Sequence, residues 1–329
     1  MLLVYSTAAL LIGFVLDLIL GDPRGIPHIV VGMGRLIAVL EKPLRSAFPK
    51  TPEGERAAGR CLVVILCLSA LAATAVLYLI YLLHPVAGIV VESLLVWQLL
   101  CMRDLKKEST LVQELLEADD LPGARKAVSM IVGRDTDVLD GPGVAKAAVE
   151  TVAENTSDGV IAPLFWLFLL GPLGGLLCKA VNTMDSMVGY KNEKYLNYGR
   201  AAALTDDAVN YIPARLSALL MTAAASLLGL DAANALRIWR RDRRKHASPN
   251  SAQTESVVAG ALHVALAGDA RYFGKWLKKE RIGDDDRPVT TEDIRRTNRM
   301  MAVSAFLMLA LILIVRIAVI LGGRLYAAI

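Results

Sequence analysis

Long apolar runs occupy both ends of the chain. Residues 2–20, 61–83, 85–101 and 301–323 are nearly free of charged side chains. Each is long enough to cross a bilayer as a helix, because a crossing takes about 17–25 residues. The His84-Pro85 step divides the two middle runs and predicts a helical hairpin, since proline ends a preceding helix. The pattern predicts an all-α, polytopic integral membrane protein with about 4–6 membrane helices.

Two further apolar runs, 159–181 and 209–229, are interrupted or flanked by polar residues. The first contains Pro163 and the sequence GPLGG at 171–175, which divides it into two half-helices. Basic segments on both sides of this region should all be cytoplasmic by the positive-inside rule, so an even number of crossings separates them. Either both runs cross or neither does. We favour the second arrangement, with a re-entrant hairpin at 159–181 and residues 182–207 on the cytoplasmic side.

The polar segments between the runs have helical periodicity. Amphipathic helices are predicted near 104–118 and 122–132, and Asp140 is positioned to cap a helix that begins near Val144. We interpret residues 1–329 as a single membrane-embedded catalytic domain. It would carry a cytoplasmic helical insert at about 102–158 and a polar cytoplasmic segment at about 230–300.

Composition supports the membrane assignment. Hydrophobic residues make up 55% of the chain and charged residues 21%, and the mean hydropathy is +0.47. The apolar share exceeds the roughly 45–50% of soluble domains. A net charge of +4 gives no reason to expect a nucleic-acid partner. The cysteines Cys61, Cys67, Cys101 and Cys178 show no metal-site spacing and are expected to be free buried thiols.

Candidate chemistry gathers between Glu150 and Arg215, where carboxylates, amides and lysines surround a short apolar run. Glu150 and Glu154 are four residues apart, and Asp158 falls one turn further on if the helix continues. Like charges at this spacing repel, so a positive group should face them. Either a bound Mg²⁺ or a basic side chain from another segment would serve. No phosphate-binding loop, nucleophile elbow or zinc motif is present.

Several strings resemble the CbiB/CobD family of cobalamin biosynthesis, adenosylcobinamide-phosphate synthase. They are DLILGDP, GRDT, ETVAENTSDGVIAPLF, KAVNTMDSMVGYKNEKY, the DD…N.IPARL run at 206–216, and RDRRKHASPNSAQTESVVAGAL. The likeness covers nearly the whole chain. One departure is Ile29, which stands where the family pattern leads us to expect a proline after histidine.

This resemblance implies an ATP-dependent acid-amine ligase in the cytoplasmic membrane. It would join the free propionate of a corrinoid, adenosylcobyric acid, to (R)-1-amino-2-propanol O-phosphate or ethanolamine phosphate. An acyl phosphate formed from ATP with Mg²⁺ is the hypothetical intermediate. The implied partners are the lipid bilayer and other late cobalamin-pathway membrane enzymes.

Within the strings that carry the resemblance, we assign metal binding or general-base catalysis to Glu154, Asp158 and Asp185. The expected substrate contacts are Asn155 and Asn182 for orientation, and a group of cationic or hydroxyl- and amide-bearing side chains for phosphate. This group comprises Lys191, Arg200, Arg243, Arg244, Lys245, His246, Ser248 and Asn250.

Two other classes of function compete with the ligase. A transporter would use Glu92, the broken helix at 171–175 and Arg215 as a substrate path. A non-catalytic scaffold for corrinoid enzymes would not need the acidic residues. ATP consumption that depends on both the corrinoid acid and the amine would distinguish the three.

Overall fold

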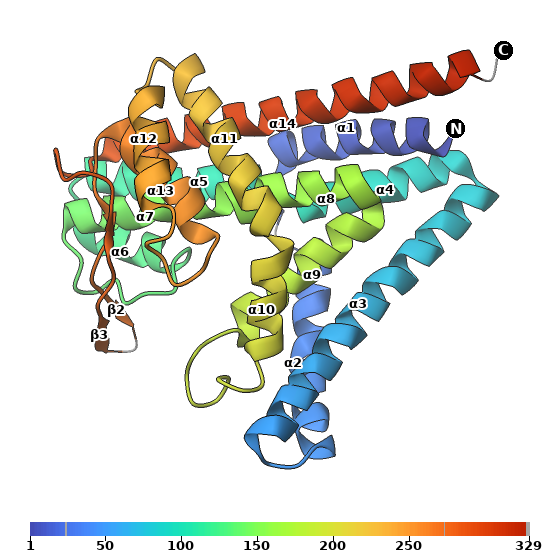
Figure 1. The fold of residues 1–329 in the computed structure, drawn as a ribbon, viewed down its shortest axis with the longest axis horizontal. Helices are drawn as coiled ribbons and strands as arrows, with labels where there is room; N and C mark the ends of the chain where they lie inside the picture. Colours follow the sequence, from blue (N-terminus) through green and yellow to red (C-terminus); the bar gives the residue numbers. More distant parts are fainter. Residues whose placement is uncertain (24, 273, 327–329) are drawn as a thin grey trace. The chain divides into compact units, whose positions relative to one another are not determined.

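The computed structural model describes residues 1–329 except 24, 273 and 327–329 (Figure 1). Helices make up most of the described chain, which confirms the predicted all-α class. The chain forms two compact units. The first comprises 1–101, 163–210 and 310–329, and the second comprises 102–162 and 211–309.

The first unit is built from long helices. Its elements are α1 (Leu2–Leu20), α2 (Ile29–Ala47), α3 (Pro52–Leu83), α4 (Pro85–Leu99), α8 (Ala162–Leu170), α9 (Pro172–Val188), α10 (Arg200–Val209) and the last part of α14 (Thr291–Tyr326). Helix α1 packs along α4, and α3 contacts α2, α4, α9 and α10 (Figure 1).

Four helical stretches are long and apolar enough to cross a membrane: Leu2–Leu20, Pro52–Leu83, Pro85–Glu117 and Thr291–Gly322. They include the predicted runs at both ends of the chain and the predicted hairpin. His84 separates α3 from α4, and its Nδ1 accepts a hydrogen bond from the Ala87 amide at 3.2 Å. His84 therefore caps α4, while Pro85 begins it without needing a backbone donor.

Glu92, considered above as part of a transport path, accepts hydrogen bonds from its neighbours in the first unit. The hydroxyls of Ser6 and Tyr81 each donate to it at 2.6 Å. A buried carboxylate with two short hydrogen bonds has a structural explanation, because an unpaired charge in hydrocarbon is costly. Arg316, also buried, donates from Nη2 to the Leu167 carbonyl at 2.8 Å.

The predicted break at 171–175 is confirmed. Helix α8 ends at Leu170, Gly171 takes a φ of 61°, and Pro172 begins α9. Glycine accepts this left-handed backbone conformation readily, and proline is favoured at the first position of a helix. Neither half-helix is among the four candidate spans. Whether they form a re-entrant hairpin with 182–207 on the cytoplasmic side stays a prediction.

The second unit combines seven helices with short strands among its described residues. The helices are α5 (Met102–Glu117), α6 (Leu121–Ser129), α7 (Gly141–Asn155), the π-helix η1 (Thr156–Ile161), α11 (Tyr211–Leu227), α12 (Ala232–Asp242) and α13 (Ser251–Leu262), followed by the first part of α14. Both predicted amphipathic helices are present. Asp140 caps α7 as predicted, since its Oδ1 accepts a hydrogen bond from the Gly143 amide at 2.9 Å.

Two small antiparallel sheets, which the sequence pattern did not predict, follow α13. Strand β1 (Leu266–Ala267) pairs with β4 (Arg281–Ile282), and β2 (Ala270–Tyr272) pairs with β3 (Lys275–Leu277). The polar segments predicted at about 102–158 and 230–300 lie in this same unit. The interpretation of the chain as one catalytic domain stays a prediction.

Small side chains allow the helices of the second unit to approach closely. Alanines and valines dominate its buried core. At the crossing of α12 and α13, a Cβ added to Gly260 would lie 2.7 Å from the Cα of Ala235. Such a contact is shorter than close packing permits, so Gly260 lets α13 lie against α12 (Figure 1). This crossing fixes the helix that carries part of the candidate site.

Candidate functional site

The candidate site begins on α7, where Glu150 and Glu154 lie one helical turn apart. Glu150 is buried and forms an ion pair with Arg134, which follows α6. Its other oxygen accepts a hydrogen bond from the Ala267 amide at 2.6 Å. The sequence left two candidates for the positive group that faces these glutamates, a bound Mg²⁺ and a basic side chain from another segment. At Glu150 it is a basic side chain, that of Arg134. Both carboxylate oxygens of Glu150 are thereby engaged.

Helix α13 supplies the groups opposite α7. Ser251, its first residue, donates a hydrogen bond to Glu154 Oε1 at 2.8 Å. Glu255 lies one turn further along α13 and is 6% exposed, and its Oε2 has no hydrogen-bond partner. The charges of Glu150 and Glu154 also repel a negative charge on Glu255. Two helices thus bring three glutamates into one electrostatically coupled group.

Burial and like charge shift the pKa of Glu255. Burial raises the pKa of Glu255 well above its ordinary value, and repulsion from Glu150 and Glu154 raises it further. The raised pKa favours the protonated form of Glu255, because neutralisation avoids a third buried negative charge. In that form Glu255 can donate a hydrogen bond, while the charge of Glu150 is stabilised by Arg134.

Cationic and imidazole groups complete the cluster. His246 and Lys279 line a cavity of about 20 Å³ together with Arg134, Glu150 and Glu255. This volume is enough for about one water molecule. Burial lowers the pKa of Arg134, but the charge of Glu150 and the hydrogen bond to it, with smaller effects of Tyr272 and Glu255, together outweigh burial and raise the pKa. Arg134 is therefore a permanent cation inside the cluster.

His246 is held in a defined orientation. Its Nδ1 accepts a hydrogen bond from the Ser248 amide at 3.1 Å, so the neutral ring carries its proton on Nε2. Burial lowers the pKa of His246; the charge of Glu154 opposes this shift, and Lys279 reinforces it. At neutral pH the ring is then uncharged and can donate from Nε2.

Part of the basic segment after α12 forms contacts with other side chains of the protein. Lys245 pairs with Asp242 at 2.8 Å, and the Arg243 guanidinium lies 5.0 Å from the ring centre of Trp239. Burial would raise the pKa of Asp242, but hydrogen bonds from Arg241, Lys245 and the Gly283 amide hold it well below its ordinary value. Of the basic residues predicted to bind phosphate here, the structure places only His246 at the glutamate cluster.

The hydroxyl and amide groups of this segment also have protein partners. Ser248 Oγ accepts a hydrogen bond from the Asn250 amide at 3.2 Å. Asn250 Oδ1 accepts one from Arg215 Nη1, also at 3.2 Å. Arg215, considered above as part of a transport path, thus ties α11 to the start of α13. These contacts shape the loop that presents His246.

The remaining predicted site residues are divided between the units. Asn155 lies at the end of α7, where its amide donates to the Thr151 carbonyl at 3.0 Å, and Asp158 lies in η1, a π-helix rather than a continued α-helix. The first unit holds Asn182 and Asp185 on α9, Lys191 after it, and Arg200 at the start of α10. Gly189 leaves room for Asp185, because an added Cβ would lie 1.9 Å from its Oδ1.

No three His, Cys, Asp or Glu side chains within the described part of the chain are arranged to hold a metal ion. Binding of Mg²⁺ by Glu154, Asp158 and Asp185 therefore stays a prediction. Glu154 and Asp158 belong to the second unit, and Asp185 belongs to the first.

Three members of the cluster were not predicted from the sequence as site residues: Arg134, Glu255 and Lys279. Two of them lie inside strings that were singled out, Arg134 in GRDT and Glu255 in SAQTES. A glutamate within a short run of small polar residues could have signalled a buried carboxyl group. Lys279 lies outside these strings in a lysine-rich stretch, and nothing in its local sequence distinguishes it.

Comparison with known proteins gives a consistent result. A family model described as CobD/Cbib protein matches residues 10–301. The cobalamin biosynthesis protein CobD of Pelobacter propionicus is 49% identical over 303 residues, covering 91% of this chain and 92% of that protein. CobD of Geobacter metallireducens is 50% identical over 295 residues, covering 89% and 92%. CbiB of Salmonella typhi is 45% identical over 305 residues, covering 93% and 96%.

No solved structure matches the chain. The identity to several relatives nevertheless extends over nearly the full length of both sequences, and the family model covers both the glutamate cluster and most of the membrane-length helices. The chain belongs to the CobD/Cbib protein family.

Proposed function

We propose that this protein acts in cobalamin biosynthesis as an ATP-dependent acid-amine ligase, adenosylcobinamide-phosphate synthase. The observation that carries the proposal is its membership of a family whose relatives, at 45–50% identity, are named cobalamin biosynthesis proteins. The reaction joins the free propionate of adenosylcobyric acid to (R)-1-amino-2-propanol O-phosphate or ethanolamine phosphate. Four membrane-length helices support a location in the cytoplasmic membrane.

The first step must activate the propionate, because oxide is too poor a leaving group for an amine to displace. A propionate oxygen attacks the γ-phosphorus of ATP, and the bond to the bridging oxygen of ADP breaks. An acyl phosphate and ADP result. Negative charge shifts onto the leaving oxygen in this step, and fixed cations stabilise such charge. Arg134, Lys279 and the Nε2–H of neutral His246 are the donors that the cluster offers for it.

The second step forms the amide bond. The amine nitrogen attacks the acyl carbon, inorganic phosphate leaves, and the nitrogen loses its extra proton to a base. His246 is not suited to accept that proton, because its Nδ1 is occupied by the Ser248 amide and its Nε2 already carries hydrogen. Glu154 is the better candidate. Its Oε1 accepts one hydrogen bond from Ser251, and the carboxylate has further lone pairs for a proton.

ATP and Mg²⁺ are the expected co-substrate and activator. The described residues show no ready-made metal cluster. Carboxylate oxygens are nevertheless ligands that Mg²⁺ accepts, usually alongside substrate phosphates. Asp158 and Asp185 would supply such ligands.

The experiment uses the full chain purified in a neutral detergent. It is supplied with adenosylcobyric acid, ATP, Mg²⁺ and the phosphorylated amino alcohol, and ADP and the corrinoid product are measured, the product by its mass. We expect ADP release only when both the acid and the amine are present. ATP-independent movement of corrinoid across vesicles without a new amide would instead support a transporter. If neither ADP release nor corrinoid movement is detected, the result would support a non-catalytic scaffold.

A further inference from the structure

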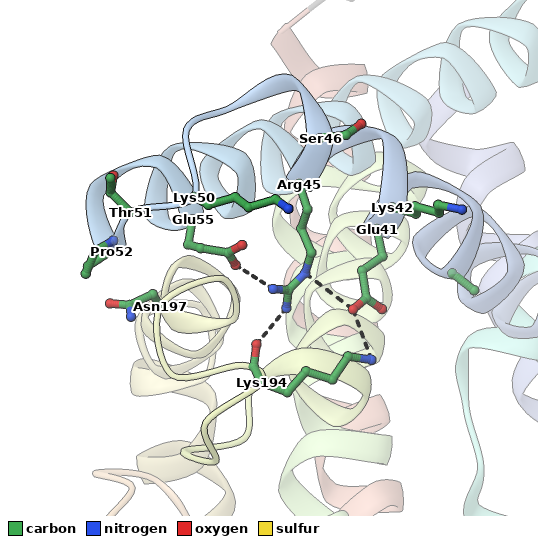
Figure 2. Close-up of a pocket in the computed structure, with 11 residues that line it drawn as sticks. Glu41, Lys42, Arg45, Ser46, Lys50, Thr51, Pro52, Glu55, Lys194 and Asn197 are labelled. Atoms are coloured by element: carbon green, nitrogen blue, oxygen red, sulfur yellow. Dashed lines mark hydrogen bonds and ion pairs between the residues drawn. The ribbon is translucent and has the colours of Figure 1, made fainter.

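A second cavity lies in the first unit, formed within residues 38–55 and the segment 194–197. It has a volume of about 720 Å³, which is the size of a small-molecule site. Figure 2 shows its lining, which joins the end of α2, the start of α3 and the loop before α10. None of the candidate catalytic residues lines it.

Arg45 is the fixed centre of this cavity. Its Nη1 donates to Glu55 at 2.6 Å, its Nη2 donates to the Lys194 carbonyl at 2.7 Å, and its Nε lies 3.4 Å from Glu41 (Figure 2). The guanidinium also lies 4.4 Å from the ring centre of the buried Tyr198. These four contacts of a planar group leave it little freedom, so Arg45 holds the two glutamates in place.

The cavity carries an excess of positive charge. Four cationic side chains, Lys42, Arg45, Lys50 and Lys194, line it against two carboxylates, Glu41 and Glu55, which gives a formal net charge of +2. Both carboxylates are already paired, Glu55 with Arg45, and Glu41 with Arg45 and Lys194. Among the described residues, Lys42 and Lys50 form no ion pair.

The directions of these lysines differ. Figure 2 shows the Lys50 side chain extending toward Arg45, whereas the Lys42 amine points away from the Arg45 group. The amines of Lys50 and Lys194 lie on opposite sides of the Arg45 guanidinium (Figure 2), and the Lys194 amine is also held by Glu41 at 3.0 Å and by the Tyr195 hydroxyl at 2.6 Å. Thr51 and Asn197 add small polar groups to the lining. Two ammonium groups with neighbouring hydroxyl and amide donors suit the oxygens of a phosphate group.

The position of the cavity along α3 bears on where such a phosphate would come from. Near the start of α3 the cavity is lined by Thr51 to Glu55, which precede the start of the apolar run at Cys61 by ten and six residues. At 1.5 Å per residue, these positions lie about 9–15 Å along the axis from the apolar run. The headgroup layer on each side of a bilayer is only about 5–8 Å thick. A phosphate in the cavity is thus farther from hydrocarbon than a lipid headgroup normally reaches.

We propose that this cavity binds a soluble phosphate-bearing small molecule, with Lys50, which forms no ion pair among the described residues, as its principal cation, Lys194, which is shared with Glu41, as the second, and Arg45 as the group that fixes the segment carrying Lys194. The inference does not depend on the ligase reaction, because it rests on charge and geometry in the first unit alone. Glycerol phosphate is a suitable probe, since it carries a phosphate without an amine, and glycerol is the matched neutral compound.

Binding of radiolabelled glycerol phosphate to the full chain in neutral detergent, measured by equilibrium dialysis at low ionic strength, tests the proposal. We expect Lys50→Gln and Lys194→Gln each to raise Kd about 5-fold, and the double variant about 20-fold, as for partly exposed charge-assisted contacts. Lys107→Gln, an exposed lysine on α5 in the second unit, serves as the matched control and should leave Kd unchanged.

Three results would overturn the proposal. One is no saturable binding of glycerol phosphate by the unaltered chain, or equal binding of glycerol. Another is an unchanged Kd in the Lys50→Gln and Lys194→Gln double variant. The third comes from vesicles: if phosphatidylglycerol, but not phosphatidylcholine, displaces the probe from the reconstituted protein in a Lys50-dependent way, the ligand is a lipid headgroup. Ligase activity is not a readout in any arm, so failure here leaves the proposed function untouched.

Discussion

The pair of Arg134 and Glu150 allows the energetics of the glutamate cluster to be measured directly. The Arg134 side chain is 17% exposed and that of Glu150 is 4% exposed. Replacing Arg134 by Met keeps much of the volume and leaves Glu150 without its cation. Removing one partner of a buried pair costs about 3–5 kcal/mol, and the partial exposure of Arg134 places our expectation near 3 kcal/mol. The Ala267 amide, which still donates to Glu150, keeps the cost from rising further.

The matching change, Glu150→Gln, preserves an acceptor for Ala267 but leaves Arg134 unpaired, and we expect it to cost about 2–3 kcal/mol. The double variant contains neither buried charge. It should therefore lose clearly less stability than the two single variants together, with a coupling energy of about 2 kcal/mol. Urea unfolding of the full chain in neutral detergent, followed by tryptophan fluorescence, gives the free energies of unfolding of the unaltered protein, the two single variants and the double variant. These values can be compared when the free energy of all four falls with urea concentration at the same slope.

A surface pair in the same unit serves as the control. Arg281 and Asp285 lie 2.8 Å apart, but their side chains are 69% and 64% exposed. Solvent screening reduces such a pair to about 0–1 kcal/mol, so Arg281→Met should change stability far less than Arg134→Met. The reasoning is refuted if the costs of Arg134→Met and Glu150→Gln simply add in the double variant to within about 0.5 kcal/mol.

Further predictions concern protonation and turnover. Because the folded-state pKa of Glu255 is raised above 4.5, folding takes up a proton, and stability should fall as pH rises from about 4.5 through the folded-state pKa. Glu255→Gln should remove this dependence of the free energy of unfolding on pH, which amounts to at most about 1.4 kcal/mol per pH unit. The same pH dependence in the variant and the unaltered protein would contradict the prediction. Asp185→Asn should lower ligase turnover at least about 100-fold if Asp185 holds Mg²⁺, and near-normal turnover at limiting Mg²⁺ would exclude that role. Arg243→Ala and Arg244→Ala should each raise KM for the phosphorylated amino alcohol about 10-fold if they contact its phosphate, whereas equal KM changes for the dephosphorylated analogue would assign them to topology.

The sequence predicted most of the helical framework because its signals are local. Apolar length marks the membrane helices, and the His84-Pro85 step and the GPLGG break place two helix ends where the structure has them. The Asp140 cap is likewise encoded within four residues. The strands after α13 escaped prediction because each is two or three residues long, which is too short for an alternating pattern to show.

The candidate site was less predictable because its members meet only through tertiary packing. The spacing of Glu150 and Glu154 indicated that a positive group should face them, but not that Arg134 would supply it from the preceding loop. The run RDRRKH indicated a cluster of free cations. In the fold, Arg241 and Lys245 both pair with Asp242, the one acid within that run, so local charge density overstated what is available to a substrate.

Glu255 shows why burial changes the meaning of a residue. In the sequence it is one more acid in a polar stretch, and an exposed acid there would be ionised and would repel phosphate. In the fold it is 6% exposed beside two other glutamates, which raises its pKa and favours the protonated form that can donate a hydrogen bond. A protonated acid beside Arg134 and the Nε2–H of His246 adds to the donors facing the cavity instead of cancelling them. The cluster can therefore contain three glutamates and still favour the negative charge that develops on a phosphoryl group.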